Sequence, residues 1–376
     1  MANVLSIVSY KIFPAKLGGQ KGIALFNQYF SEYHKLTCVT IKDNDPSLAT
    51  YNMLNILSNS KLRYINIFYF FRLRSVIKRS EITHVVIEHP YYGWLGMLLK
   101  WACGIKLIVH SHNIESLRFK STGKWWWKVL GWYEWVVHRF ADFTFCITEE
   151  DRQYMIENFG VKAKNLAVIT YGIEMEAPPT AMDKVLARIF IQKRFGIPTE
   201  CALFLFNGTL DYLPNLEALK AILDKINPSF IKVGIPYRII ICGKNLPSEL
   251  NDLKEYKDQN IVYAGFVDDV SIYFKGSDVF LNPVTDGGGI KTKLVEALGY
   301  NLNVVSTRNG AIGVSQDICN GKLVVCKDND RQDFSHEMET ALRFLERTIP
   351  SSYFKHFSWK NIARKAANSL PFQGGK

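Results

Sequence analysis

A glycine-rich segment with two lysines has the residue types of an anion-binding turn. It reads Asp286-Gly287-Gly288-Gly289-Ile290-Lys291-Thr292-Lys293, with Glu296 one helical turn further on. An apolar run precedes it at residues 279–283, and apolar residues recur at helical spacing over 290–298, which predicts a strand, a turn and a helix. N–H groups at a helix start attract phosphate, and glycine permits its close approach. Lys291 and Lys293 would add full charges. The simpler alternative is a strand–helix connection that uses glycine only to turn tightly.

The elements that must position this turn alternate as in a doubly wound parallel sheet. Six apolar runs typical of buried strands fall in the first half: 4–9, 36–41, 84–88, 106–110, 143–148 and 166–170. Six more follow: 203–207, 237–243, 261–265, 279–283, 304–306 and 323–326. A polar, proline-bearing stretch at 171–179 reads as a linker. The sequence therefore predicts an α/β protein of two Rossmann-like domains, 1–174 and 175–350, facing each other across a cleft.

Polar or glycine-rich turns follow several of these strands. They are Lys16-Leu17-Gly18-Gly19-Gln20-Lys21-Gly22, His110-Ser111-His112-Asn113-Ile114-Glu115, Asn207-Gly208-Thr209, Cys242-Gly243-Lys244-Asn245 and Gly265-Phe266-Val267-Asp268. Each alone is a weak signal, because glycine after a strand is the usual way to turn. Ligands of such sheets bind at the carboxyl ends of the strands, where all these turns would meet.

Positive charge is concentrated in the first part of the chain. Residues 1–140 hold 18 Lys and Arg against 7 Asp and Glu, whereas the remaining residues balance at 28 against 28. A basic surface of this kind suits nucleic acid, an anionic bilayer or a phosphorylated acceptor. No nucleic-acid-binding motif accompanies it, so we expect no nucleic-acid partner.

The cysteines and the hydropathy pattern indicate a cytoplasmic protein. Seven scattered cysteines form no C-x-x-C pair, which favours reduced thiols and argues against a zinc site. The N-terminal residues have no basic leader, and Lys100 and Lys106 interrupt the most apolar stretch, so neither a secretory signal nor a transmembrane helix is predicted. Asp43-Asn44-Asp45 is the nearest approach to a metal motif and falls in a loop.

The ordered set of motifs resembles the GT-B glycosyltransferases, specifically the large retaining family four that uses sugar nucleotides. The resemblance covers nearly the whole chain, from the glycines at 18–19 through Ser111–Glu115, the 171–173 segment and Cys242–Lys244 to the glycine–lysine–glutamate segment. Residues 351–376, with Phe357-Ser358-Trp359-Lys360, resemble the family's C-terminal helix that crosses back to the first domain.

The resemblance implies roles for individual residues. The donor diphosphate would lie on the N–H groups of Gly289, Ile290 and Lys291, with Lys291, Lys293 and Lys244 offsetting its charge, beside Gly208 and Gly287. Glu296 would hold the ribose, and main-chain atoms near Phe266 and Val267 would contact the base. Gly18 and Gly19 would let the first domain close over the phosphates. His112 would lie near the transferred sugar; alternatively it only caps the following helix.

Two departures from the family pattern concern the phosphate site. Many relatives carry a glutamate eight residues before Glu296, where this chain has Gly288; Asp286 could substitute for it. Many also carry an arginine and a lysine after the first strand of the second domain, whereas residues 209–215 here contain no cation. The phosphate charge is therefore assigned to the lysines, and no metal or other cofactor is expected.

A tryptophan-rich basic segment at 124–139 is the other unusual feature. Trp125, Trp126, Trp127 and Lys128 open it, and aromatic residues occupy nearly every face of the predicted helix. Such a segment suits docking on anionic lipid. The alternative is a helix buried between sheet and neighbours, with Glu134 and Arg139 at its rim.

Together these observations predict a retaining, metal-independent glycosyltransferase of polysaccharide or glycolipid biosynthesis. The donor would be a UDP- or GDP-sugar and the acceptor a glycan or a lipid-linked molecule. The protein would be cytoplasmic and could contact the inner membrane face peripherally. Two alternatives remain: an epimerase or phosphorylase of the same fold, and a catalytically degenerate protein that binds sugar nucleotides.

Overall fold

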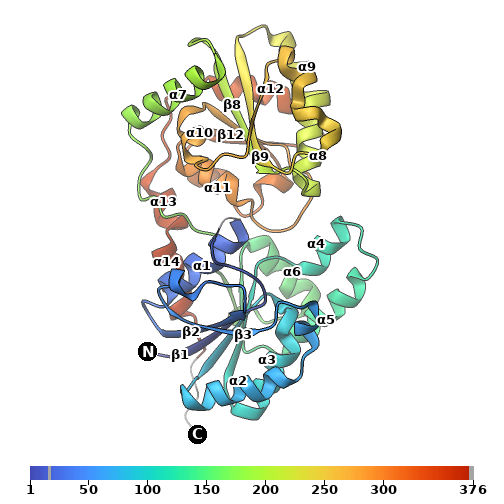
Figure 1. Ribbon diagram of the computed structural model, residues 1–376, viewed down its shortest axis with the longest axis vertical. Helices are drawn as coiled ribbons and strands as arrows, with labels where there is room; N and C mark the ends of the chain where they lie inside the picture. Colours follow the sequence, from blue (N-terminus) through green and yellow to red (C-terminus); the bar gives the residue numbers. More distant parts are fainter. Residues whose placement is uncertain (16–17, 372–376) are drawn as a thin grey trace. The chain divides into compact units, whose positions relative to one another are not determined.

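The chain folds as two parallel-sheet units, seen in a computed structural model that describes residues 1–15 and 18–371. Unit 1 comprises Met1–Glu174 together with the segment from Phe357 onward, and unit 2 comprises Met175–His356. Each unit has one parallel sheet with helices packed on it (Figure 1). This confirms the predicted fold class of two Rossmann-like α/β domains.

The sheet of unit 1 has seven strands in the order β3-β2-β1-β4-β5-β6-β7. The strands are β1 (Asn3–Val8), β2 (Lys35–Ile41), β3 (Asn52–Leu57), β4 (His84–Glu88), β5 (Lys106–Ser111), β6 (Phe143–Cys146) and β7 (Leu166–Val168). The helices are α1 (Gly18–Phe30), α2 (Phe68–Arg79), α3 (Gly93–Cys103), α4 (Glu115–Ser121), α5 (Trp127–Phe140), α6 (Glu149–Phe159) and α14 (Trp359–Asn368). β3 was not predicted from the sequence, because two asparagines interrupt its apolar run at the edge of the sheet.

The sheet of unit 2 has six strands in the order β10-β9-β8-β11-β12-β13. They are β8 (Ala202–Thr209), β9 (Tyr237–Lys244), β10 (Ile261–Gly265), β11 (Val279–Asn282), β12 (Asn303–Thr307) and β13 (Leu323–Cys326). The helices are α7 (Ala181–Phe195), α8 (Leu213–Ala221), α9 (Asn227–Phe230), α10 (Ser271–Gly276), α11 (Thr292–Gly299), α12 (Arg331–Leu342) and α13 (Ser351–Phe357). Strand residues buried on both faces, such as all four of β11, explain why the sequence shows continuous apolar runs.

The C-terminal segment forms two helices rather than one. α13 ends at Phe357, where the chain passes from unit 2 to unit 1, and α14 lies beside α1 within unit 1 (Figure 1). Trp359, Ile362, Ala363 and Ala366 form the buried stripe of α14 at helical spacing. The ring of Trp359 is accommodated because Gly172 has no side chain, since a Cβ there would lie 2.5 Å from it. These contacts fasten the end of the chain to unit 1.

Candidate functional site

The glycine-rich turn lies at the point where the strand order of unit 2 reverses. From β8 the chain proceeds outward through β9 and β10, and from β11 it proceeds the other way through β12 and β13. The loops after β8 and β11 therefore diverge, and parallel sheets bind ligands in the crevice this divergence leaves. Gly208 lies at the end of β8, and residues 283–291 follow β11.

Glycine is required at two positions of this turn. Gly287 and Gly289 have φ values of 94° and 68°, in the left-handed region that other residues avoid. The Lys291 ammonium donates to the carbonyl oxygens of Gly287 and Gly289, at 2.9 and 3.0 Å, and so closes the turn on itself. Asp286 and Gly288 are exposed. α11 begins at Thr292, so the turn leads directly into the positive end of a helix.

Lys293 extends from α11 to the end of β8. Its Nζ donates to the carbonyl oxygen of Asn207 at 2.7 Å and lies 3.4 Å from Oδ1 of Asn215. Gly208 makes this possible, because a Cβ there would lie 2.5 Å from Nζ. Burial of the ammonium lowers the pKa of Lys293 to about 8, with Glu296 opposing the shift. A positive charge is thus held at the switch point although the loop after β8 carries none.

Hydrogen bonds beneath the turn fix the course of the chain after β11. The Asn282 side chain donates to Oγ of Ser306 and to the carbonyl oxygen of Gly310, at 2.9 and 3.0 Å. The Thr307 hydroxyl donates to the carbonyl oxygen of Val284 and accepts the N–H of Gly310 at 3.0 Å. These buried bonds connect the loops after β11 and β12, so the turn rests on a rigid base.

The remaining predicted residues of unit 2 also lie at the carboxyl ends of its strands. Lys244 ends β9 and is partly exposed, while Phe266 and Val267 directly follow β10. Glu296 lies one turn into α11 and is partly buried, as is Ile290 before the helix. Asn207 and Asn215 were not predicted as site residues; no spacing signal marks them, because their role depends on where Lys293 reaches.

In unit 1, His112 follows β5 and is held by a buried carboxylate. Its Nε2 lies 2.6 Å from Oε2 of Glu88, the last residue of β4, and Nδ1 of His110 lies 3.0 Å from the same oxygen. Burial alone would raise the pKa of Glu88, but His110 and His112 hold it well below its usual range. An ionised carboxylate only accepts hydrogen bonds, so Nε2 of His112 carries the proton that it donates to Glu88. The other ring nitrogen, Nδ1, is the atom that can form a hydrogen bond with a ligand.

A second buried carboxylate, Glu115, organises the neighbouring residues. It accepts from Tyr91 at 2.7 Å and from Arg118 at 2.5 Å, and its Oε1 lies 3.0 Å from Nδ1 of His89. His89 has a φ of 65°, a strained conformation for a residue with a side chain, and its Nε2 lies 3.2 Å from the Tyr10 hydroxyl. Burial opposes ionisation of Glu115, yet His89 and Arg118 keep its pKa well below the usual range. The region at the carboxyl ends of β1 and β4 is therefore polar, and its side chains are held by hydrogen bonds.

Glu134 of α5 joins this network through the main chain of α4. Its carboxylate accepts the backbone N–H groups of Glu115 and Ser116, both at 2.7 Å, at the start of α4. Burial raises the pKa of Glu134 to about 7. The buried-helix alternative predicted Glu134 at the rim of the helix. Glu134 is instead completely buried, because its partners are main-chain donors of another helix.

Glu88, His110 and His112 also have the chemistry of metal ligands. Their candidate ligand atoms all lie within 4.8 Å of one another. The short contact between His112 and Glu88 is that of a charge-assisted hydrogen bond. We therefore assign His112 and Glu88 to hydrogen bonding and route no step through a metal ion.

The N-terminal glycines begin a helix rather than forming an open loop. α1 starts at Gly18, and Gly19 lies next to the Tyr10 hydroxyl, which is 3.9 Å from where a Cβ would be. Lys16 and Leu17 of the predicted glycine loop lie outside the described residues.

The tryptophan-rich segment is divided between buried and exposed side chains. Trp125 is 86% exposed, whereas Trp126 packs on Phe119 with ring centroids 4.6 Å apart. Trp127 is partly buried, with the ammonium groups of Lys120 and Lys128 lying 4.9 and 5.7 Å from its ring centroid. Neither the fully buried nor the fully interfacial alternative describes the whole segment. Among the described helices, none has the length and apolar character needed to cross a bilayer.

Comparison with known proteins gives matches to both units. A family model described as Glycosyltransferase Family 4 matches residues 28–177, and one described as Glycosyl transferases group 1 matches residues 202–343. The UDP-Gal:alpha-D-GlcNAc-diphosphoundecaprenol alpha-1,3-galactosyltransferase of Escherichia coli is 25% identical over 69% of this chain. Two curated relatives, this enzyme included, are matched over 66% and 33% of their own lengths, which is less than two thirds.

Solved structures match over nearly the full length of the chain. A glycosyltransferase from Rickettsia africae superposes with a TM-score of 0.74 at 14% identity, covering 98% of this chain and 97% of that one. The Anabaena protein HepE in complex with UDP also gives a TM-score of 0.74 at 14% identity, covering 98% and 99%. At this identity the likeness establishes the fold.

Proposed function

The chain belongs to the family-four glycosyltransferases of the GT-B fold, and from this premise we propose that it transfers a sugar from a nucleoside-diphosphate sugar to a glycan or lipid-linked acceptor. The donor is a UDP- or GDP-sugar, and the reaction retains the configuration at the anomeric carbon. The relative that acts on a diphosphoundecaprenol-linked sugar supports an acceptor of lipid-linked type.

One observation carries the donor assignment: the Lys293 ammonium is fixed at the end of β8, beside the glycine-rich turn and the start of α11. Breaking the bond between the sugar and the diphosphate leaves negative charge on the β-phosphate oxygen. A positioned ammonium and helix-start N–H groups stabilise that charge without a covalent step. Gly289, Ile290 and Lys291 would supply the N–H groups, and Glu296 would accept from the ribose.

The proposed chemistry needs no protein nucleophile. The acceptor oxygen attacks the anomeric carbon from the face of the leaving group, and the acceptor proton passes to the departing phosphate oxygen. In this scheme His112 contacts a sugar hydroxyl through Nδ1, since Nε2 is held by Glu88. Phe266, which is largely exposed at the end of β10, and Val267 would lie against the base.

The basic, tryptophan-bearing surface of unit 1 supports an acceptor presented at a membrane. Trp125 and Lys128 are exposed, and tryptophan with lysine is a pairing typical of bilayer interfaces. We expect the triple substitution of Trp125, Trp126 and Trp127 by serine to reduce binding to anionic liposomes, and unchanged binding would argue against this contact. The proposed location is the cytoplasm with peripheral association at the inner membrane face.

Binding and turnover assays separate the proposed function from its alternatives. Calorimetry with UDP and GDP, followed by a panel of UDP- and GDP-sugars, tests donor binding directly. An epimerase would convert the sugar nucleotide without an acceptor, and a phosphorylase would require phosphate. Binding without turnover for every donor and acceptor would indicate a catalytically degenerate protein. Absence of nucleoside-diphosphate binding would overturn the donor site itself.

A further inference from the structure

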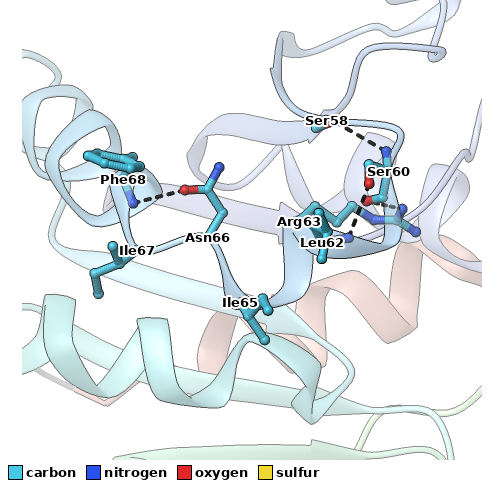
Figure 2. A pocket seen from close by; sticks show the side chains of 8 residues that line it. All are labelled: Ser58, Ser60, Leu62, Arg63, Ile65, Asn66, Ile67 and Phe68. Carbon is cyan, nitrogen blue, oxygen red and sulfur yellow. Dashed lines mark hydrogen bonds between the residues drawn. The ribbon is translucent and has the colours of Figure 1, made fainter.

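An exposed apolar ridge lies where the connection after β3 enters α2 in unit 1. Leu62, Ile65 and Phe68 are 69%, 75% and 71% exposed, and Ile67 is also exposed. They line a shallow, open groove of about 500 Å³ (Figure 2). Asn66 accepts the N–H of Phe68 at 3.0 Å and so sets the start of the helix. Large apolar side chains gathered on a surface in this way indicate an interaction site.

Exposed cations follow the ridge along α2. The buried face of this helix consists of Tyr69, Leu73 and Ile77. On the exposed side, Phe68 is followed by Phe71, which is 61% exposed, and then by the exposed cations Arg72, Arg74, Lys78 and Arg79. Residues 61–80 contain six Lys and Arg and no Asp or Glu. The segment is therefore apolar at one end and strongly positive at the other.

The groove is not built to bind a small anion. Arg63, the cation that lines it, donates to the carbonyl oxygens of Ser9, Asn59 and Ser60 and to the Tyr64 hydroxyl, at 2.8 to 3.2 Å. Its guanidinium holds the loop in place. The exposed cations lie further along α2 and are spread over its exposed surface rather than gathered at one point. Such a distribution suits contact with many headgroups of a bilayer.

α2 and the tryptophan-bearing helix α5 belong to the same layer of helices, with α3 between them. α2, α3 and α5 pack on one hydrophobic core of unit 1, and α3 contacts both of its neighbours (Figure 1). The outer side of this layer also exposes Trp101 of α3 and Trp132 of α5. α2, α3 and α5 thus each expose large aromatic side chains.

We propose that the segment Lys61–Arg79 is a docking surface for an anionic lipid bilayer, with Phe68 and Phe71 inserted at the interface and the α2 cations on the headgroups. The inference deepens the proposed function and rests on it, since it names the surface that brings the enzyme to a lipid-linked acceptor. Apolar insertion beside a dense positive row is the combination that gives interfacial helices their preference for anionic membranes. The uniform positive sign of the charges in residues 61–79 matches a layer of anionic headgroups.

Sedimentation of the full-length protein with vesicles tests the proposal. Vesicles of phosphatidylcholine with about one third phosphatidylglycerol are compared with pure phosphatidylcholine. We expect Phe68→Ser combined with Phe71→Ser to weaken binding to anionic vesicles about tenfold. Neutralising Arg72, Arg74, Lys78 and Arg79 with glutamine should weaken it at least tenfold, since cations near such a surface are attracted to the anionic headgroups. A matched control, Leu186→Ser with Phe190→Ser, removes two exposed apolar side chains from α7 of unit 2 and should change nothing.

Each other outcome overturns the inference. Undiminished vesicle binding by both α2 variants, an equal loss in the α7 control, or a wild-type dimer that the phenylalanine substitutions dissociate would do so. Thermal melting shows whether the surface variants remain folded. Nucleoside-diphosphate binding and transfer to a detergent-free, soluble acceptor should be unaffected in the α2 variants, so failure of the docking surface is distinguishable from failure of the proposed function.

Discussion

Replacing Lys293 by methionine should weaken nucleotide binding without lowering the stability of the fold. The substitution keeps the length and apolar character of the side chain and removes the charge that Asn207 holds at the end of β8. A hydrogen bond between a charged group and its partner is worth about 1.5–3 kcal/mol, so we expect the dissociation constants for UDP or GDP, whichever binds, to rise about ten- to a hundredfold.

The same substitution should leave the protein as stable as before, or slightly more so. Burial lowers the pKa of Lys293 from 10.5 to about 8, so keeping the ammonium charged at neutral pH costs roughly 3 kcal/mol. Methionine removes this cost but leaves the Asn207 carbonyl without its donor, an offset of about 1–3 kcal/mol. The two effects nearly cancel, and Tm should therefore be unchanged or raised.

The pH dependence supplies an independent signature. A diphosphate binds the protonated ammonium and raises its pKa, so wild-type affinity should fall by up to tenfold per pH unit above about 8. Lys293→Met should show no such decline. Calorimetry from pH 6.5 to 9.5 measures both effects. Lys232→Met is the control, because Lys232 is exposed and precedes β9, at the amino end of that strand and away from the proposed site. Affinity within twofold of wild type at pH 7, with the decline near pH 8 retained, would refute the assigned role.

Three further predictions concern the neighbouring residues. Gly208→Ala should displace the Lys293 ammonium and weaken nucleotide binding, and it should add little to Lys293→Met in the double variant, as calorimetry can show. Glu88→Gln should lower kcat on the order of tenfold, because His112 loses the ionised, charge-assisted partner that orients its ring, while nucleotide affinity stays the same. Since the pKa of Glu134 is raised from 4.5 to about 7, wild-type stability should fall as pH rises through that interval, by up to roughly 3 kcal/mol; Glu134→Gln should flatten this trend in Tm measured at pH 4.5 and 7.

The strands that carry these sites were predictable wherever they are buried on both faces. β4 and β11 each contain an uninterrupted apolar stretch, and every residue of both strands is buried. β3 was not predictable by the same criterion, because its asparagines are tolerated only at an edge of the sheet. The order of the strands, and with it the switch point between β8 and β11, depends on packing between segments that sequence periodicity does not encode.

The candidate site divides in the same way. Gly287 and Gly289 could be assigned from sequence, because a turn with two left-handed residues directly restricts the residue types it accepts. Glu88 and Glu134 could not. A lone carboxylate at the end of a strand or within an aromatic helix has no local signature, and each acquires its role from a partner 18 to 24 residues away.

The absence of a cation after β8 therefore does not leave the turn without positive charge. The ammonium reaches this position from α11, and Gly208 provides the space that it occupies. This arrangement places the charge and the helix-start N–H groups on one element, so their separation is set by α11 rather than by two independent loops. A cation carried by the β8 loop would have to be positioned by that loop's own conformation. Preorganisation of donors around a developing charge is what lowers the barrier, and a single helix achieves it with fewer degrees of freedom to restrict.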